Sequence, residues 1–346
     1  MKIKTEQELD NILKFLNFLK EGIIIIDSQK NIEFINDYAK KILNVGNIEG
    51  ENFADVIQDD YLYSIISHEF KGKDGQSKSI ILKNEEININ DKIYLINFYE
   101  IGNKKFLHFS DITPFEVYKQ AKKDFVSNVS HELKTPIAVL KGVMETLESE
   151  DDISTIKNFA KMGKKRINQM DSLINDLLVL ARLESKEEKV EKTSMRLYPA
   201  VSNIFKDLQE AASEKNIKLH NKIKRDFSVS VDKKKFNILL KNLIENAIKY
   251  NKQDGEVTVN AYKKDGYSYI EVEDTGIGIP KESLPLVFER FYRVDKSRSR
   301  NIGGTGLGLS IVKHIAESHN GKVSVESEFG KGSKFIVKIP NHNKEV

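Results

Sequence analysis

Two long segments in the middle of the chain carry apolar residues at the spacing of packed helices. The second repeats apolar or small residues at alternating intervals of three and four: Ile153, Ile156, Ala160, Gly163, Ile167, Met170, Ile174, Leu177 and Ala181. The first has a similar seam: Phe125, Val129, Leu133, Pro136, Leu140, Val143 and Leu147. The polar stretch 148–155 supplies a turn between them, with Asp152 as the expected N-cap of the second helix. The pattern therefore predicts a helical hairpin with a heptad seam.

Such a hairpin hides its seam poorly on its own. Pairing two copies buries both seams in a four-helix bundle, which predicts a homodimer. An intramolecular hairpin packed on another domain of the same chain is the alternative.

The N-terminal region has the short apolar runs of a sheet. Ile23–Asp27 and Ile32–Ile35 flank a polar turn and predict a β-hairpin, followed by a short helix over Asp37–Leu43. Later β-branched and aromatic segments are Lys78–Lys83, Glu86–Ile89, Lys92–Tyr99 and Lys105–Ser110. They predict a small antiparallel sheet with helices over residues 9–113.

The C-terminal region mixes the two periodicities. Strands are expected over Lys218–Ile223, Val257–Lys263, Tyr267–Asp274, Val323–Ser327 and Lys334–Ile339, and helices over Tyr198–Lys215, Lys233–Tyr250 and Gly308–Ser318. This mixture predicts an α/β sandwich. The whole chain is then a multidomain α+β protein, divided at 9–113, 114–189 and 190–346, with the charged stretch Ser185–Thr193 as the linker before the last domain.

Composition narrows the possible functions. Lys and Arg total 55 against 52 Asp and Glu, a net charge of +3 that gives no reason to expect nucleic-acid binding. The chain has no cysteine, which excludes disulfides, zinc–thiolate sites, iron–sulfur clusters and a cysteine nucleophile. Its longest aliphatic run is too short for a spanning helix, and its N-terminus lacks a signal peptide's apolar core. We expect a soluble, cytoplasmic chain, although one trimmed of membrane segments would look the same.

One histidine lies outside the helical seam. At about 100° per residue, His131 sits roughly 200° from the seam positions Val129 and Leu133 and is therefore expected on the outer face. Glu132 follows it, and a carboxylate can hold one ring proton while the other nitrogen attacks. Pro136 is expected to kink the helix. A lone surface histidine is usually just solvated.

The predicted helix 233–250 has one polar stripe. Asn242, Glu245, Asn246 and Lys249 are spaced as neighbours on a helix whose other side is apolar. Amide and carboxylate oxygens can ligate Mg²⁺, and a lysine can meet phosphate. A solvated amphipathic face is the alternative, which the low helix propensity of two asparagines weakens.

Two glycine-rich loops follow. One, EDTGIGIP, comes after a strand and contains Asp274, which can accept a hydrogen bond from an exocyclic amine. The other, GGTGLGLS at 303–310, leads into a helix, where glycines expose backbone amides to phosphate. Neither loop fits GxxxxGK[ST] or GxGxxG, which disfavours a P-loop or Rossmann site.

These segments together resemble the bacterial sensor histidine kinases. SHELKTP at 130–136 matches the phosphoacceptor box, and NLIENAIKY at 242–250 resembles the asparagine box of the GHKL-type ATP-binding domain. Asp274–Gly278 resembles the first glycine box, FERFYR at 288–293 the phenylalanine box, and Gly304–Leu309 the second glycine box. All five boxes occur in the family's order across roughly 120–340.

The resemblance implies a role for each matching residue. His131 would accept the phosphoryl group from Mg-ATP, Glu132 would act as base or orienting partner, and Thr135 would position water for dephosphorylating a partner. Asn246 would ligate Mg²⁺, and Asp274 would read the adenine amine. The remaining ATP-binding positions implied are Asn242, Glu245, Lys249, Tyr250, Gly276, Gly278, Arg293, Gly304, Thr305, Gly306, Leu307 and Gly308. Arg290 and Arg298 are close alternatives to Arg293.

Residues 22–39 resemble the opening of a PAS sensor domain. That resemblance implies a possible small-ligand pocket or a dimerising module. His68 and His108 could ligate haem, but isolated histidines usually do not.

The expected function is autophosphorylation of His131 and transfer to an aspartate of a response regulator, with phosphatase activity as well. A different ATPase or serine kinase on the same nucleotide fold, or a non-catalytic scaffold that signals by binding, are the alternatives.

Overall fold

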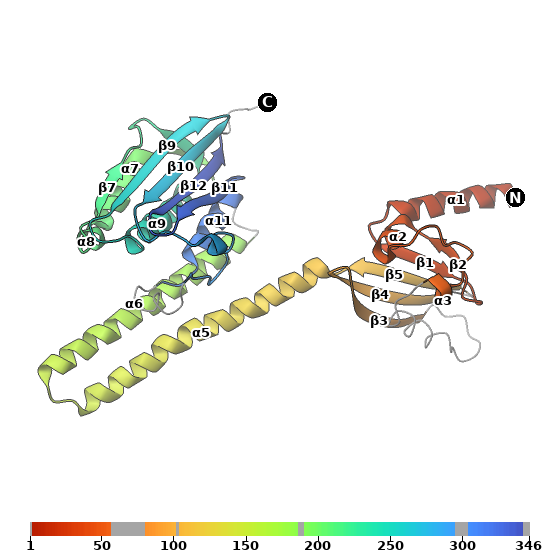
Figure 1. Cartoon of the computed structure of the whole chain (residues 1–346), viewed down its shortest axis with the longest axis horizontal. Coiled ribbons are helices and arrows are strands. Elements are labelled where there is room, and N and C mark those ends of the chain that lie inside the picture. The colour runs from red at the N-terminus through yellow and green to blue at the C-terminus, as the bar shows by residue number, and fades with distance from the viewer. Residues whose placement is uncertain (1, 57–79, 102–103, 186–189, 295–303, 342–346) are drawn as a thin grey trace. The chain divides into compact units, whose positions relative to one another are not determined.

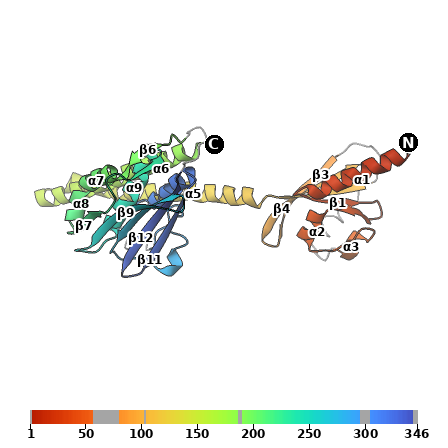
Figure 2. The same ribbon diagram turned by 90° about the horizontal axis from the view of Figure 1, so that it is seen from above.

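The computed structural model describes residues 2–56, 80–101, 104–185, 190–294 and 304–341. The chain forms two compact units, Met1–Asp124 and Phe125–Val346. Figures 1 and 2 show them from two directions. None of the helices in the described ranges is both long enough and apolar enough to cross a bilayer.

The first unit is built on a five-stranded antiparallel sheet in the order β2-β1-β5-β4-β3. Its elements are α1 (Lys2–Phe18), β1 (Gly22–Ile26), β2 (Ile32–Ile35), α2 (Asp37–Leu43), α3 (Phe53–Val56), β3 (Ile80–Ile89), β4 (Lys92–Ile101) and β5 (Lys104–Asp111). Ile24, Ile96 and Phe109 are fully buried in its core, because alternate residues of each strand face the same side.

A buried asparagine ties the end of α1 to the sheet. Asn36 is fully buried, and its Oδ1 accepts hydrogen bonds from the backbone N–H groups of Ile23 and Ala39. Its Nδ2 donates to the carbonyl oxygens of Leu16 and Glu21. All four hydrogen-bonding positions of the amide are satisfied, so burying this polar side chain leaves no hydrogen bond unmade.

A helical hairpin follows, formed by α5 (Thr113–Ser149) and α6 (Ile153–Glu184). Asp152 caps α6 as expected, its carboxylate accepting from the Thr155 backbone N–H at 2.8 Å. Helix α5 continues through Pro136, where the sequence predicts a kink, and the proline ring is buried. The residues of the first seam are all buried or half-buried, as a helix packed along that face requires.

The second seam divides into two faces. Ile156, Gly163, Met170 and Leu177 are buried or half-buried. The alternating set Ile153, Ala160, Ile167, Ile174 and Ala181 is exposed instead, with Ile153 at 67% and Ile167 at 57%. Within a single chain, therefore, half of the predicted seam lacks the cover that the heptad pattern implies.

The C-terminal lobe is a second five-stranded sheet with helices on one face (Figure 2). The order is β11-β12-β10-β9-β7, antiparallel except for the parallel pair β7–β9. Its elements are β7 (Lys218–Asn221), β9 (Glu256–Lys264), β10 (Tyr267–Asp274), β11 (Lys322–Glu328), β12 (Gly332–Pro340), α7 (Leu197–Asp207), α8 (Gln209–Ser213), α9 (Lys233–Lys249) and α11 (Gly308–Ser318), with the 3-10 turn η1 (Lys281–Ser283). A two-stranded ribbon joins β6 (Thr193–Arg196) to β8 (Ser228–Val231).

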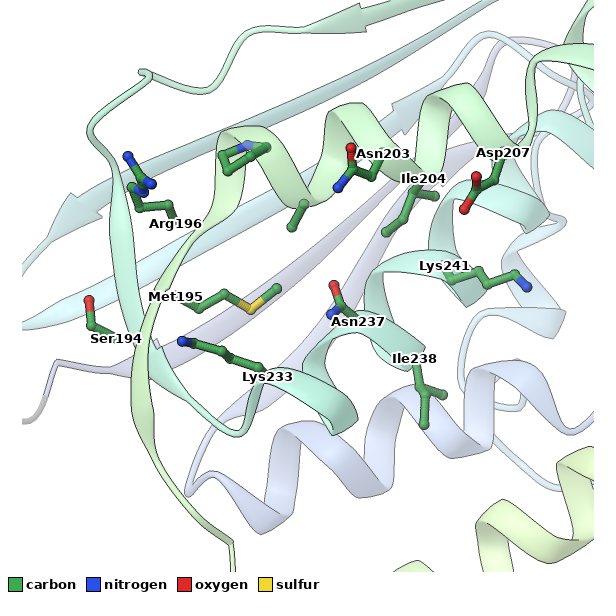
Figure 3. A pocket seen from close by; sticks show the side chains of 12 residues that line it. Ser194, Met195, Arg196, Asn203, Ile204, Asp207, Lys233, Asn237, Ile238 and Lys241 are labelled. Carbon is green, nitrogen blue, oxygen red and sulfur yellow. The ribbon is translucent and has the colours of Figure 1, made fainter.

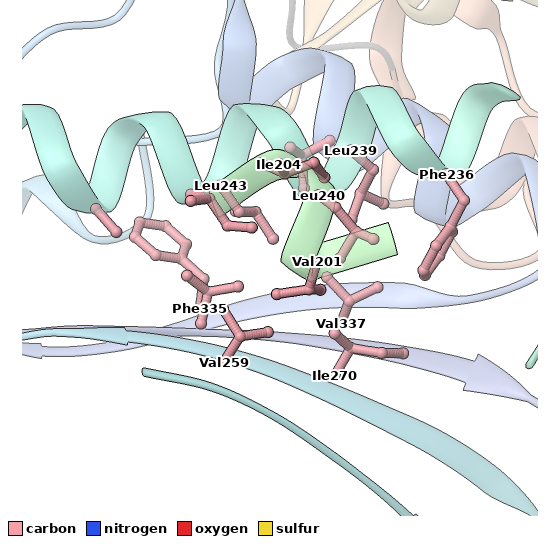
Figure 4. Close-up of a cluster of buried hydrophobic side chains, with 14 of the residues drawn as sticks. Val201, Ile204, Phe236, Leu239, Leu240, Leu243, Val259, Ile270, Phe335 and Val337 are labelled. Carbon is pink, nitrogen blue, oxygen red and sulfur yellow. The ribbon is translucent and has the colours of Figure 1, made fainter. Parts of the chain in front are cut away.

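The lobe's core lies between the sheet and α9. Leu239 and Leu243 of α9 pack toward Val259 and Val337 of the sheet, and all four are fully buried (Figure 4). Leu173 and Leu180 of α6 belong to the same buried cluster, so the hairpin and the lobe share part of one core. Apolar burial of this extent is the main favourable term in folding the lobe.

The structure adds elements that the sequence pattern does not predict: α1, α3, β6, β8 and the 3-10 turn η1. It joins Glu86–Ile89 with the segment before it into the single strand β3, and divides Tyr198–Lys215 into α7 and α8. Helix α11 and strand β10 have the bounds expected from sequence.

Candidate functional site

Helix α9 is fixed at both ends. At its start, the Asp232 carboxylate accepts from the backbone N–H groups of Lys234 and Lys235. The Asp232 N–H in turn donates to Nε2 of the fully buried His319 at 2.9 Å, while His319 Nδ1–H donates to the Ile315 carbonyl at 2.8 Å. These partners require the neutral ring, and burial lowers the pKa of His319 accordingly.

A half-buried ammonium covers the other end of α9. Lys215 Nζ donates to the carbonyl oxygens of Ile248, Lys249 and Asn251 at 3.3, 2.6 and 3.2 Å. A cation at a helix C-terminus satisfies its unpaired carbonyls and complements its dipole. The last turn of α9, which carries part of the polar stripe, is therefore held in place.

The polar stripe of α9 faces the second glycine loop. Asn242, Glu245, Asn246 and Lys249 are all half-buried, while Leu243 and Ile244 on the other side are fully buried. A Cβ added to Gly308 would lie 2.5 Å from Asn242 Oδ1, and one added to Gly304 would collide with Lys249 Nζ. The structure thus brings the asparagine box and the second glycine box together.

Asp274 closes the other side of the site at the end of β10. It is only 7% exposed, and its Oδ1 accepts from the Gly276 backbone N–H at 2.8 Å. Burial raises the pKa of Asp274 to about 6. Gly276 packs against the Tyr250 carbonyl, and Ile277 N–H donates to that same oxygen at 3.1 Å. The first glycine box is therefore bonded directly to the end of α9.

The phenylalanine box supports the second glycine loop. Phe291 N–H donates to the Gly306 carbonyl at 2.9 Å, and both residues have positive φ, +61° and +73°. A Cβ on Gly306 would lie 2.8 Å from Phe291 Cα, so only glycine fits there. A phenylalanine in this region is strained, as occurs at functional sites.

Of the three candidate arginines, Arg293 is the one near the polar stripe. Burial lowers the pKa of Lys249 and raises that of Tyr250, and the charge of Arg293 acts downward on both, as expected of a cation close to them. Arg290 is paired with Glu184 on α6. Arg298 lies outside the described residues.

His131 is exposed on α5, as its position outside the seam predicts. Glu132 is half-buried beside it, and Thr135 Oγ1 donates to the His131 carbonyl at 3.2 Å. The imidazole is thus accessible to a phosphoryl donor, with a carboxylate next to it in sequence and a hydroxyl one turn away.

The donor set of α9 fits a hard cation. The half-buried side chains of Asn246 and Glu245 offer amide and carboxylate oxygens, the ligand types that Mg²⁺ takes. Glu245 also pairs with Lys241 at 3.6 Å, and burial raises its pKa. No cluster of three or more His, Asp or Glu that could hold a metal occurs among the described residues.

Sequence reasoning missed several supporting residues. Besides Lys215 and His319, these include Asn251, whose buried side chain donates to the Glu256 carbonyl and accepts from Thr275 Oγ1. They also include Asp176 on α6, whose Oδ2 accepts from Thr305 Oγ1 at 2.6 Å. A lone carboxylate within the apolar run LINDLLVLA was the available signal.

A separate pocket of about 580 Å³ lies beside the first turns of α9 (Figure 3). It is bounded by β6, α7 and the start of α9, with Arg196, Asn203 and Lys233 among its lining residues. Of the proposed nucleotide residues none lines it, so it is distinct from the site described above.

Family models match two parts of the chain. Residues 121–186 match the His Kinase A (phospho-acceptor) domain, and residues 231–343 match the histidine kinase-, DNA gyrase B- and HSP90-like ATPase family. The phosphate regulon sensor protein PhoR of Pseudomonas aeruginosa is 32% identical over 337 residues, covering 94% of this chain and 73% of that protein. The chain belongs to the bacterial sensor histidine kinases. It is accordingly an ATP-dependent protein histidine kinase that phosphorylates itself and passes the phosphoryl group on.

Other members of the family are similarly related. The sensor histidine kinase WalK of Bacillus subtilis is 31% identical, covering 97% of this chain and 56% of that protein. The sensor-like histidine kinase SenX3 of Mycolicibacterium smegmatis is 32% identical, covering 93% of this chain and 83% of that protein.

Two solved structures share the fold. Histidine kinase ThkA in complex with response regulator protein TrrA covers 94% of this kinase and 97% of that chain, at 20% identity and a TM-score of 0.53. Histidine kinase AdeS of Acinetobacter baumannii covers 62% of this kinase and 98% of that chain, at 22% identity and a TM-score of 0.50.

Lys249 gives the site a predicted pH dependence. Burial, with Arg293 nearby, lowers the pKa of Lys249 to about 8. The lysine is charged below that pH and loses its charge above it, so ATP affinity is expected to fall as pH rises from 7 to 9. Calorimetry should show this fall in the wild type. Lys249→Met should bind roughly tenfold more weakly at pH 7, with a shallower fall.

The matched control is Lys264→Met, which removes an exposed lysine at the end of β9 and should leave the wild-type pH profile intact. A wild-type affinity that does not change between pH 7 and 9 would contradict the role of Lys249.

Proposed function

We propose that His131 is the phosphoacceptor of this kinase and that the stripe on α9, with the two glycine loops, binds the ATP. The supporting observation is an exposed His131 within the part of the chain that matches the phosphoacceptor model. The lobe that would hold ATP lies within the ATPase match and in the same compact unit.

Some of the proposed nucleotide residues suit the adenine of ATP, and others suit its phosphates. Asp274, with Gly276 and Gly278 leaving room beside it, suits the adenine amine. The backbone carbonyl of Tyr250 lies beside Gly276, and its ring lies beneath Lys249 Nζ. Lys249 and Arg293 supply positive charge for the phosphates. The residues that complete the proposed site are Asn242, Glu245, Asn246, Gly304, Thr305, Gly306, Leu307 and Gly308.

The reaction requires little covalent chemistry from the protein. One imidazole nitrogen of His131 attacks the γ-phosphorus with its lone pair, forming an N–P bond as the bond to the bridging oxygen breaks and ADP leaves with that electron pair. Glu132 holds or accepts the proton of the other ring nitrogen. Lys249 and Arg293 neutralise the phosphates, and the rigid α5 presents the acceptor for in-line attack.

A magnesium ion would be held by Asn246, with Glu245 beside it. When bound with ATP, the cation neutralises phosphate charge. The nucleotide would be oriented by residues of α9, whose last turn is held in place by Lys215.

We propose a homodimer formed by the hairpin. The exposed apolar set on α6 continues on α5, where Ile137 is 52% and Met144 57% exposed. Covering this face with a second copy buries the half of the heptad seam that one chain leaves in solvent, as in a four-helix bundle.

The partner proposed for phosphotransfer is the receiver domain of a response regulator. ThkA, which shares the fold, was solved with the response regulator protein TrrA. We further propose that the enzyme removes phosphate from that partner, with the Thr135 hydroxyl orienting the water.

We propose that residues 9–113 form a PAS-like sensor. The sheet order β2-β1-β5-β4-β3 and the buried hydrogen bonds of Asn36 support it.

Four expectations from the sequence stay predictions. They are the domain boundaries at 113/114 and 189/190, the linker at 185–193, a small ligand for the sensor and a cytoplasmic location. Of the two histidines considered for haem, His108 contacts Glu21 at 2.8 Å, and His68 lies outside the described residues.

Autophosphorylation tests the acceptor directly. With γ-labelled ATP and Mg²⁺, wild type should acquire acid-labile, base-stable label, and His131→Gln should acquire none. His220→Gln, a control on β7 whose ring contacts Glu256, should label like wild type. Label that persists in His131→Gln would eliminate His131 as the acceptor.

Sedimentation tests the dimer. Wild type should sediment as a dimer at micromolar concentration, and a double variant, Ile167→Glu with Ile174→Glu, should be monomeric because it places four charges in the bundle. Phe329→Glu, at a residue 64% exposed on the lobe, should remain dimeric. A monomeric wild type would refute the hairpin dimer.

Dephosphorylation of the partner tests Thr135. Thr135→Ala should slow the loss of phosphate from the response regulator by about tenfold or more, the usual scale of one positioned proton-transfer or orienting group, with autophosphorylation retained. Equal rates in variant and wild type would remove Thr135 from the phosphatase step.

A further inference from the structure

Asp176 is a carboxylate from the hairpin that reaches the proposed nucleotide site. It lies on α6 among Leu173, Leu177 and Leu180, which pack on the lobe's core. Asp176 is half-buried, and its Oδ2 accepts a hydrogen bond from Thr305 Oγ1 in the second glycine loop at 2.6 Å. The same hydroxyl accepts from the Leu307 backbone N–H at 3.2 Å, so Asp176 anchors the turn of that loop.

The charges around Asp176 are those of the nucleotide site. Lys249 favours the ionised form of Asp176, and Asp176 in turn disfavours ionisation of Glu245. Burial nevertheless raises the pKa of Asp176, so its negative charge is held at a cost in free energy. A ligand with several negative charges beside Lys249 would increase that cost.

Neighbouring contacts join the same two surfaces. Glu184 on α6 pairs with Arg290, and His314 Nε2 donates to the Leu183 carbonyl at 2.8 Å. The rings of Phe125 on α5 and Phe291 in the phenylalanine box lie 5.8 Å apart. The loop, the phenylalanine box and α11 therefore all contact the hairpin.

We propose that Asp176 is a positioning residue that opposes ATP binding: it holds the Thr305 hydroxyl and faces Lys249 until the triphosphate displaces it. This inference rests on the proposed nucleotide site. Asp176 and the phosphates compete for the Thr305 hydroxyl and for the charge of Lys249. In addition, the carboxylate of Asp176 repels the phosphates. ATP therefore binds more tightly when the loop has left α6.

Thermodynamic linkage gives the consequence. If Asp176 weakens ATP binding, bound ATP weakens the contact between Asp176 and the loop by the same factor. Loading the lobe with ATP thus favours its release from α6, and release frees the lobe to approach an acceptor histidine. One carboxylate couples nucleotide occupancy to docking of the lobe on the hairpin.

The test removes the charge and keeps the shape. Asp176→Asn retains an oxygen that can accept from Thr305, so the full-length variant should fold and bind ATP about fivefold more tightly, at the lower end of typical coupling between sites. Adenosine, which lacks phosphates, should bind both proteins equally. The control is Asp171→Asn, at an exposed carboxylate on the same helix that accepts a hydrogen bond from Asn175 Nδ2; this change should leave ATP affinity unchanged.

Hydrogen exchange gives a second readout in the wild type. Adding ATP should reduce the protection of amides over 173–180, and adenosine should not. Unchanged or weaker ATP binding by Asp176→Asn, or an equal gain for adenosine, would overturn the inference. Neither result resembles failure of the nucleotide site itself, in which wild type would bind no ATP and acquire no label.

Discussion

The structure depends on one helix that must bury one face and offer the other to a ligand. Helix α9 supplies fully buried leucines to the lobe's core and half-buried polar groups to the proposed nucleotide site. Neither face can move without the other, because protein interiors are close-packed and tolerate little displacement. Asp232 and His319 hold one end of the helix and Lys215 the other, so its orientation is fixed from both ends.

Helix α6 of the hairpin also has faces with different surroundings, and it has three of them. One side of α6 packs on α5, another contributes Leu173 and Leu180 to the lobe's core, and a third leaves Ile167 and Ile174 in solvent. A heptad pattern records only that apolar residues recur, not what covers them. The same seam residues therefore divide between an intramolecular neighbour, as the second alternative raised by the sequence expects, and the second copy that we propose.

Elements with a strong apolar periodicity were predictable from the sequence. The elements that were missed have no clear periodicity. Helix α11 and strand β10 follow clear patterns and end where expected. Helix α1 does not, because Phe15 and Phe18 are 61% and 84% exposed and no core imposes a stripe on it. Strands β6 and β8 have four residues each, too few for alternation to show. Helix α5 runs through Pro136, which is buried.

The residues of the site that belong to the family's sequence motifs were predictable. The residues that hold those motifs in place were not, because they lie elsewhere in the sequence. Lys215, His319 and Asp176 act through contacts 33 to 129 residues away in sequence, and no local pattern encodes such a pairing. The site itself is set apart by electrostatics: burial raises the pKa of Asp274 and lowers that of Lys249, so the charged form of each group is held at a cost in free energy. The ATP that we propose for this site would suit both groups, because its adenine amine can donate to Asp274 while its phosphates pair with Lys249.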